Sequence, residues 1–279
     1  MSTAAQPAVG FIGLGDQGLP MATAIAEGGY QLHVWARRPA SLDALGDTPH
    51  VRHDTIADLG AACDIVALCV STDEDVLRIV SGELLGALRP GSIVVNHGTG
   101  VPRSAVRLAE LCADGGVGVL DAPVSGGRPA AEARTLTTLV GGPEDVLRRC
   151  EPVLRTFARH VVHAGPAGAG QLTKLFNNTL LMMNQAAIAD VLELAKGAGL
   201  DPVALVDALR LGSATSAALT LLNTMVNPAT VEHLSRVEAL DMELFDTAMR
   251  NAGVDATAVT VRALSGANRL PDVIDRLNP

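Results

Sequence analysis

The chain has 279 residues, of which 48% are hydrophobic, and a formal net charge of −9. This size and apolar content are enough for a buried core and two domains. The acidic balance argues against nucleic acid or an anionic membrane as a partner, because both attract clustered lysine and arginine. No signal-peptide pattern and no apolar run of about 18 residues occurs, so we expect a cytoplasmic protein that does not enter a membrane.

The first predicted elements are a strand at 8–12 and a helix at 19–27, separated by the pattern Gly13-x-Gly15-x-x-Gly18. Glycines permit a tight turn and let the backbone approach a pyrophosphate, and the helix N-terminus offers free N–H groups and a positive dipole end. In a chain with 28 glycines the bare pattern would mean little. Its place between a strand and a helix favours a dinucleotide site over a structural turn.

The second predicted strand, 31–35, ends about 20 residues after the glycines, where an acidic side chain would bind the adenosine ribose of NAD. The chain has Ala36, Arg37 and Arg38 there, followed by Pro39. Two guanidinium groups suit the 2′-phosphate of NADP, because arginine makes paired hydrogen bonds to phosphate. A solvated turn is the alternative, but the position at the strand end favours NADP, with NAD as the less favoured cofactor.

The alternation of strands and helices continues to about residue 165. Strands are predicted at 64–70, 92–96, 117–120, 136–140 and 160–163, and helices at 73–80, 102–113 and from just after Pro143 to about 156. This pattern predicts a parallel, doubly wound sheet. The later segments are helical, at 168–196, 202–211, 217–225, 238–252 and 256–267. We therefore expect an α/β dinucleotide-binding domain over 1–165 and an all-α substrate and dimerisation domain over 166–279.

The second domain has few aromatic residues with which to fill a core. The whole chain has one Trp, one Tyr and four Phe, so these helices must pack closely through alanine and leucine. Some of their apolar faces are then expected to be shared with another subunit. We predict a homodimer or homotetramer.

Cysteine and histidine give no metal or disulfide pattern. The cysteines are Cys63, Cys69, Cys112 and Cys150. They lie in apolar segments without a C-x-x-C pair, which favours buried thiols. His160 and His163 lie on one predicted strand, but no cysteine or carboxylate nearby completes a ligand set, so we expect no metal.

Lys174 is the candidate acid or base for chemistry at a hydroxyl or carbonyl group. It lies one turn into the long predicted helix among apolar neighbours, where burial would lower its pKa toward a useful range. Asn178 follows four residues later on the same helix face, so both side chains can reach one substrate. A lysine extending to solvent is the alternative. Gly168 and Gly170 favour the functional interpretation, because they let another backbone or a ligand come close to this turn.

Ser125, Gly126 and Gly127 follow the strand predicted at 117–120. In open α/β sheets, ligands bind beyond the carboxyl ends of the strands. The serine hydroxyl and the two glycine N–H groups suit a substrate carboxylate. On this motif alone an ordinary turn is an equally good interpretation.

Four motifs in order resemble those of the β-hydroxyacid dehydrogenases, the family that includes 3-hydroxyisobutyrate dehydrogenase and tartronate semialdehyde reductase and is related to 6-phosphogluconate dehydrogenase. They are Gly10-Phe-Ile-Gly13-Leu-Gly15-x-x-Gly18-x-Pro20-Met21, Asp121-Ala-Pro-Val-Ser125-Gly126-Gly127, Thr135-Leu136 with Gly141-Gly142, and Gly168-x-Gly170-x-x-x-Lys174-x-x-Asn177-Asn178. The resemblance runs nearly end to end. It implies a Rossmann domain and an all-α domain joined by the long helix, with the active site in the cleft.

The resemblance also implies roles for single residues. Lys174 matches the family's general acid or base, Asn178 matches the asparagine that orients substrate, and the segment 125–127 matches the one that holds the substrate carboxylate. Arg37 is similar to the arginine that selects NADP, and Thr99 to a threonine near the nicotinamide ribose. The predicted cofactor contacts are Gly13, Leu14, Gly15, Gln17, Gly18, Ala36, Arg37, Arg38, Val70 and Thr99.

The chain departs from the family at positions that concern the substrate. Leu240 stands where the family usually has the lysine of a Lys-Asp-Leu segment, so a cation is missing. Gly98 replaces the usual serine before Thr99, and Ala130 and Arg134 stand where glycines are usual. These changes indicate a reshaped, more apolar pocket.

We therefore predict an NADP-dependent oxidoreductase. It would convert the hydroxyl group of a β-hydroxyacid to the carbonyl, and the carbonyl back to the hydroxyl, by hydride transfer, with Lys174 as the acid or base. An imine reductase is one alternative, because that class shares the architecture but generally replaces the lysine. A non-catalytic NADP-binding assembly or sensor module is another. Lys174, Asn178 and Ser125 together disfavour the non-catalytic module. Lys174 with Asn178 also counts against an imine reductase, whereas Leu240 and the lean pocket count slightly for it.

Overall fold

The computed structural model describes residues 6–278 and divides into two compact units, 1–174 and 175–279. The first unit is an α/β structure and the second is all-α. The division falls within one continuous helix, α8 (Ala169–Gly197), which begins in the first unit and ends in the second.

The described strands of the first unit form one nine-stranded sheet with the order β3-β2-β1-β4-β5-β6-β8-β7, and β9 also pairs with β8. The strands are β1 (Val9–Ile12), β2 (Leu32–Trp35), β3 (Val51–Arg52), β4 (Ile65–Leu68), β5 (Ile93–Asn96), β6 (Gly118–Asp121), β7 (Val124–Ser125), β8 (Leu136–Gly141) and β9 (Ala158–Gly165). Strands β1 to β6 are parallel and have the strand order of dinucleotide-binding folds. The predicted doubly wound α/β fold is confirmed.

The extension of the sheet differs in direction from the first six strands. β8 pairs antiparallel with both β6 and β7, and β9 returns parallel to β8. The chain reaches β8 through β7 and one short helix, and not through the long crossover that a parallel pair needs, which explains the reversal.

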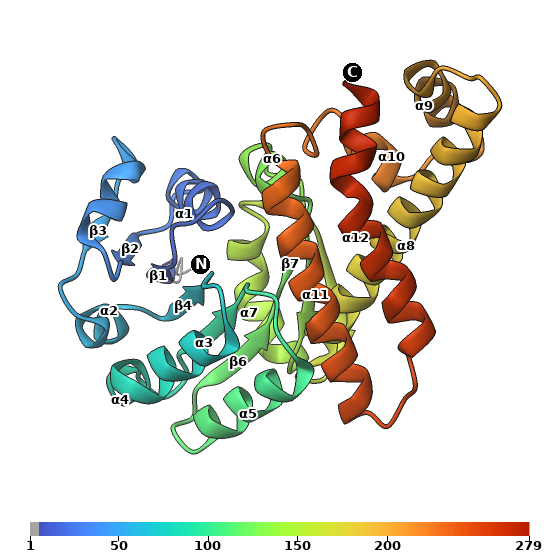
Figure 1. Cartoon of the computed structure of the whole chain (residues 1–279). Helices are drawn as coiled ribbons and strands as arrows, with labels where there is room; N and C mark the ends of the chain where they lie inside the picture. The colour runs from blue at the N-terminus through green and yellow to red at the C-terminus, as the bar shows by residue number, and fades with distance from the viewer. Residues whose placement is uncertain (1–5, 279) are drawn as a thin grey trace. The chain divides into compact units, whose positions relative to one another are not determined.

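Helices cover both faces of this sheet. They are α1 (Gly18–Glu27), η1 (Pro39–Leu45), α2 (Ile56–Ala62), α3 (Asp73–Ile79), the π-helical turn η2 (Val80–Leu84), α4 (Leu85–Ala87), α5 (Pro102–Ala113), α6 (Gly127–Glu132) and α7 (Glu144–Leu154). Side chains of α2, α3 and α5 enter the core on one face, where these helices lie together in Figure 1, and those of α1 and α7 enter the core on the other.

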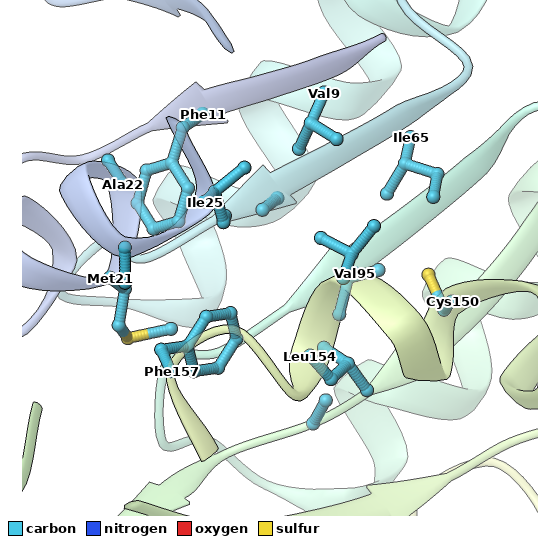
Figure 2. Close-up of a cluster of buried hydrophobic side chains, with 14 of the residues drawn as sticks. Val9, Phe11, Met21, Ala22, Ile25, Ile65, Val95, Cys150, Leu154 and Phe157 are labelled. Carbon is cyan, nitrogen blue, oxygen red and sulfur yellow. The ribbon is translucent and has the colours of Figure 1, made fainter. Parts of the chain in front are cut away.

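Successive residues of the central strands point to opposite faces. Val9 and Phe11 of β1 enter the core beneath α1 and α7, whereas Ile12 enters the core beneath α2, α3 and α5. Figure 2 shows the first of these cores, where Met21 of α1 and Phe157 lie close to the strand residues. Such strands, buried on both faces, are typical of parallel sheets between helical layers.

The second unit consists of the remainder of α8 with α9 (Pro202–Leu211), α10 (Ala217–Leu221), α11 (Val231–Asn251) and α12 (Thr257–Leu277). Its core includes Leu192 of α8, Val206 of α9, Leu219 of α10 and Ile274 of α12. Helices α11 and α12 run side by side (Figure 1). None of the described helices combines the length and apolar character needed to cross a membrane.

Helix boundaries differ from prediction mainly in this unit. α11 begins at Val231, earlier than the predicted 238, and α12 continues to Leu277, past the predicted end at 267. α10 ends at Leu221, because Leu222 takes an extended conformation and leads into a turn.

Candidate active site

The glycine turn after β1 has the geometry of a phosphate cradle. Gly13 has φ +103°, and a Cβ there would collide with the carbonyl oxygen of Cys69, so no other residue fits. A Cβ at Gly15 would meet nothing within 4 Å, which leaves open space above the turn. Gln17, the N-cap of α1, makes no capping bond with its side chain. In the first turn of α1 the N–H groups of Leu19 and Met21 donate to the carbonyl oxygens of Gly15 and Gln17, and Pro20 has no N–H, so the N–H of Gly18 and the glycine turn are what suit an anion such as a dinucleotide pyrophosphate.

Other predicted cofactor contacts lie at the same edge of the sheet. Leu14 packs against the core on the α1 side, and Gly18 is buried at the start of α1. The carboxyl end of β1 is in register with those of β2 and β4, so Ala36 and Val70 follow strands that are neighbours of the glycine turn.

Arg37 and Arg38 are exposed immediately after β2, and no acidic residue occupies this strand end. Arg37 also acts on Asp75, in the first turn of α3. The pKa of the Asp75 carboxyl is lowered mainly by a hydrogen bond from Arg78, and the charge of Arg37 adds to this effect. Arg37 follows β2 at the carboxyl edge of the sheet.

The loop after β5 carries Thr99. A Cβ on Gly98 would be 2.7 Å from the carbonyl oxygen of Val70, so the glycine lets the loops after β4 and β5 approach each other closely. His97, just before, is buried between Phe11 and Phe157, and its Nδ1 bonds to the carbonyl oxygen of Ala122 at 2.8 Å. Burial lowers the pKa of His97 to about 4, so this imidazole is neutral at physiological pH.

Ser125, Gly126 and Gly127 do not form a simple turn after β6. Ser125 is the last residue of β7, opposite Thr137 of β8, and Gly127 begins α6. Gly126 is the N-cap of α6 and has φ +126°. The segment is therefore held by strand pairing on one side and a helix on the other.

The start of α8 is attached directly to the sheet. Asp121, buried at the end of β6, accepts hydrogen bonds from the N–H groups of Gly168 and Gln171, both at 2.8 Å. Burial raises the pKa of Asp121, and these backbone donors act in the opposite direction. A Cβ at Gly170 would lie 2.5 Å from the carbonyl oxygens of Asp121 and Leu139. The expected close approach of another backbone at these glycines is confirmed.

Lys174 is half-buried, one turn after this anchored start. Because α8 begins on β6, the backbone of Lys174 has a fixed position relative to the carboxyl edge of the sheet. Asn178 follows one turn later and is buried in the second unit. Its Nδ2 donates to Asp241 Oδ2 at 2.6 Å and its Oδ1 accepts from Asn177 at 2.9 Å, so both ends of the amide are fixed.

Two further positions on α11 are relevant to the site around Asn178. Leu240, for which the sequence resemblance predicts a lysine, is 56% exposed. Glu238 is buried and accepts a hydrogen bond from Gln185 of α8 at 2.9 Å. Burial raises the pKa of Glu238 to about 7, and Asp241 adds to the rise.

Three residues of this arrangement were not identified as site residues from the sequence: Asp121, Gln171 and Asp241. A signal existed for each of them, because Asp121 begins the motif that ends in Gly127, Gln171 lies inside the motif that ends in Asn178, and Asp241 follows Leu240. Spacing alone did not reveal what they bind.

The described residues include no group of three or more His, Cys, Asp or Glu that fits a metal ion. His163 bonds instead to the carbonyl oxygen of Gly142 at 2.8 Å. All the cysteines are free thiols, and Cys69 is the one that is only partly buried.

Two family models together match most of the chain. Residues 8–165 match the NAD binding domain of 6-phosphogluconate dehydrogenase, and residues 168–267 match the NAD-binding domain of NADP-dependent 3-hydroxyisobutyrate dehydrogenase.

Similar proteins cover most of the chain. An NAD-dependent L-serine dehydrogenase and a 3-hydroxyisobutyrate dehydrogenase, both from Pseudomonas aeruginosa, are 34% and 33% identical over 217 residues, which is 77% of this chain and 73% of each relative. A Mycobacterium tuberculosis 3-hydroxyisobutyrate dehydrogenase, solved with L-serine, has a TM-score of 0.85 and 27% identity over 99% of this chain and 100% of its own.

Proposed function

The chain belongs to the β-hydroxyacid dehydrogenase family and is an NAD(P)-dependent oxidoreductase acting on CH–OH groups, and we propose that it uses NADP to oxidise a small 3-hydroxy carboxylate. The observation that carries this proposal is the start of α8. Asp121 and Gly170 attach it to the carboxyl edge of the sheet, which fixes the backbone of Lys174 there.

The residues of the glycine turn would hold the pyrophosphate, with the N–H of Gly18 at the start of α1 as a donor. Val70 and Thr99 would line the path toward the nicotinamide. Among the described residues the Thr99 hydroxyl has no hydrogen-bond partner, which suits it to a bound ribose. The bound dinucleotide supplies the hydride acceptor for oxidation and the donor for reduction.

NADP is the proposed cofactor because two cations, Arg37 and Arg38, follow β2 and no carboxylate occupies that strand end. A guanidinium binds a 2′-phosphate with paired, charge-assisted hydrogen bonds, whereas an acid there would repel it. The Pseudomonas aeruginosa L-serine dehydrogenase is named NAD-dependent, so a direct comparison of NADP with NAD is part of the test.

Lys174 is the proposed proton acceptor in oxidation. As the hydride leaves the substrate carbon, the hydroxyl proton moves to the neutral amine at Nζ; in reduction the ammonium returns it to the carbonyl oxygen. The chain has 21 Lys and Arg residues, but only Lys174 and Lys196 are lysines. Arginine stays protonated in proteins and cannot exchange a proton in this way. Asn178, held by Asp241, would orient the substrate hydroxyl.

The proposed substrate class is small 3-hydroxy carboxylates, with the carboxylate at Ser125, Gly126 and Gly127. The relatives named for 3-hydroxyisobutyrate and L-serine share this chemistry, because both molecules carry a hydroxyl group on the carbon next to the one that bears the carboxylate. Leu240 supplies no charge where family members usually have a lysine, so we expect an uncharged or apolar group near that position.

The decisive experiment measures NADP⁺ and NAD⁺ reduction by absorbance with 3-hydroxyisobutyrate, serine, larger 3-hydroxyacids and uncharged alcohols, and the reverse reaction with aldehydes, ketones and cyclic imines. Turnover of 3-hydroxyacids that is faster with NADP⁺ supports the proposal. Turnover of imines alone would indicate an imine reductase. Tight NADPH binding without turnover on the whole panel would indicate a non-catalytic module.

We also propose that the chain is a homodimer or homotetramer through its second unit. Leu194 of α8 and Val261 of α12 are 75% and 63% exposed, which is unfavourable for large apolar side chains in water. Analytical ultracentrifugation should give a mass at least twice that of the chain, and Leu194→Asp should shift it toward the monomer. A monomeric wild type would contradict this assembly.

A further inference from the structure

The side chain of Gln171 connects α8 to the loop that carries Thr99. Its Oε1 accepts from the N–H of Gly100 at 2.8 Å, and its Nε2 donates to the carbonyl oxygen of Gly98 at 2.7 Å. Gln171 is 1% exposed, so water does not compete for these bonds. One amide therefore binds the residue before Thr99 and the residue after it.

Two other side chains bond to the same loop from other elements. Asn96 Oδ1 accepts from the N–H of Gly98 at 3.0 Å, and Asp73 Oδ2 accepts from the N–H of Val101 at 2.9 Å. Asp73 belongs to α3 and Asn96 to β5, whereas the Gln171 bonds reach the loop from α8. Without the Gln171 side chain the loop would keep its bonds to β5 and α3 but lose these two bonds to α8.

Gln171 is itself fixed at its backbone. Its N–H donates to Asp121, and it lies three residues before Lys174, within the same turn of α8. Its side chain is thus a short, buried connection between the helix that carries Lys174 and the loop that carries Thr99.

We propose that Gln171 is a positioning residue that sets the Thr99 loop relative to Lys174, and so sets the distance between the nicotinamide end of the cofactor and the proton-transferring amine. This inference rests on the proposed function for the roles of Thr99 and Lys174. The amide is required because the two bonds need one acceptor and one donor. A carboxylate would keep the bond to Gly100 but place a second acceptor against the carbonyl oxygen of Gly98.

The first test uses Gln171→Ala, with Thr173→Ala as the matched control. Thr173 is exposed on the same turn, and its hydroxyl bonds only to the helix's own Ala169 carbonyl at 2.8 Å. In Gln171→Ala we expect hydrogen exchange of the peptide that spans 97–102 to accelerate by about tenfold. We expect kcat to fall by about 100-fold, because small misplacements of reacting groups have large kinetic effects. Thr173→Ala should match wild type in both.

A substrate deuterated at the carbon that loses hydride separates positioning from loss of folded protein. A smaller folded fraction would lower kcat and leave the isotope effect and KM unchanged. A misplaced loop slows the hydride step itself, so the isotope effect on kcat should rise in Gln171→Ala. An unchanged isotope effect with reduced kcat would overturn the positioning role.

Gln171→Glu is nearly isosteric and covers the case in which the alanine variant does not fold. The protonated acid has an O–H donor for Gly98, whereas the carboxylate has none, so kcat of this variant relative to wild type should fall as pH rises from 5 to 9. A ratio that does not change with pH would overturn the inference.

The exchange measurement needs no turnover, so it separates this inference from the proposed function. Wild-type exchange across 97–102 in Gln171→Ala overturns the inference whatever the activity. Accelerated exchange in a protein that turns over no hydroxyacid would support the attachment by Gln171 and refute the proposed function.

Discussion

At the scale of single residues, Lys196 is a control for the role of Lys174 as the acid or base. Both lysines lie on α8, but Lys196 is exposed in its last turn. Lys174→Ala should lower kcat by about 10²- to 10⁴-fold, the usual contribution of an acid or base, with little change in the Kd for NADPH. Lys196→Ala should leave both unchanged. Steady-state kinetics and fluorescence titration of NADPH measure these effects, and full turnover by Lys174→Ala would exclude the proposed proton transfer.

Arg37 should determine which dinucleotide binds. Arg37→Ala removes a charged donor that only NADPH can use, so the Kd for NADPH should rise by about 10- to 100-fold while the Kd for NADH changes little. Arg52→Ala is the control, because Arg52 is an exposed arginine of β3 that pairs with Asp43. Equal losses for the two cofactors in a fluorescence titration would refute the contact between Arg37 and the 2′-phosphate.

Residue chemistry in the sequence points to candidates such as Lys174, whose role stays a prediction, but it does not reveal long-range hydrogen-bond partners such as Gln171 and Asp241. Gln171 bonds to Gly98, 73 residues away, and Asn178 bonds to Asp241, 63 residues away. Local spacing contains no information about such pairs, because the fold alone brings them together. The glycine turn was predictable because its strand, loop and helix are contiguous.

At the scale of elements, the packing of α8 against α11 should depend on pH through Glu238. Its pKa rises from 4.5 to about 7 on folding because burial disfavours the carboxylate. The protonated form therefore stabilises the fold fully below about pH 4.5, and this stabilisation is lost as pH rises to about 7. The full change corresponds to about 3 kcal/mol of unfolding free energy.

Glu238→Gln removes the titrating group and keeps the shape. The unfolding free energy of wild type relative to this variant should decrease between pH 4.5 and 7 and then stay constant, as measured by urea denaturation at each pH. A difference between the two proteins that does not depend on pH would show that Glu238 titrates normally in the fold.

Helix and strand positions were predicted best where hydrophobic periodicity is long or where a proline fixes the first turn, as for α5 and α9, which begin at Pro102 and Pro202. The sequence did not predict β3, whose two residues are both exposed, or the short helix α6. Neither element is long enough to show a periodic pattern of hydrophobic residues. The end of α12 was placed too early because the helix continues through Pro271.

At the scale of the whole molecule, NADPH should stabilise the first unit in particular. A ligand at 100 times its Kd adds about 2.7 kcal/mol to the stability of the state that binds it. Hydrogen exchange should slow in the peptides that contain 13–18, 36–38 and 98–101. Protection confined to 175–279 would contradict the assignment of the cofactor site. The Arg37→Ala variant provides the control, because it should need more NADPH for the same protection.

The contact at Gly170 also limits how this enzyme can evolve. Any side chain at Gly170 would meet the backbone of β6 and β8 at 2.5 Å, and backbone atoms cannot move aside as a side chain can. Almost every substitution at Gly170 would therefore disturb the packing of α8 against the sheet. Variation is expected instead at exposed positions such as Leu240, whose side chain is 56% exposed. A lineage built on this chain would be expected to keep its reaction and exchange its substrates.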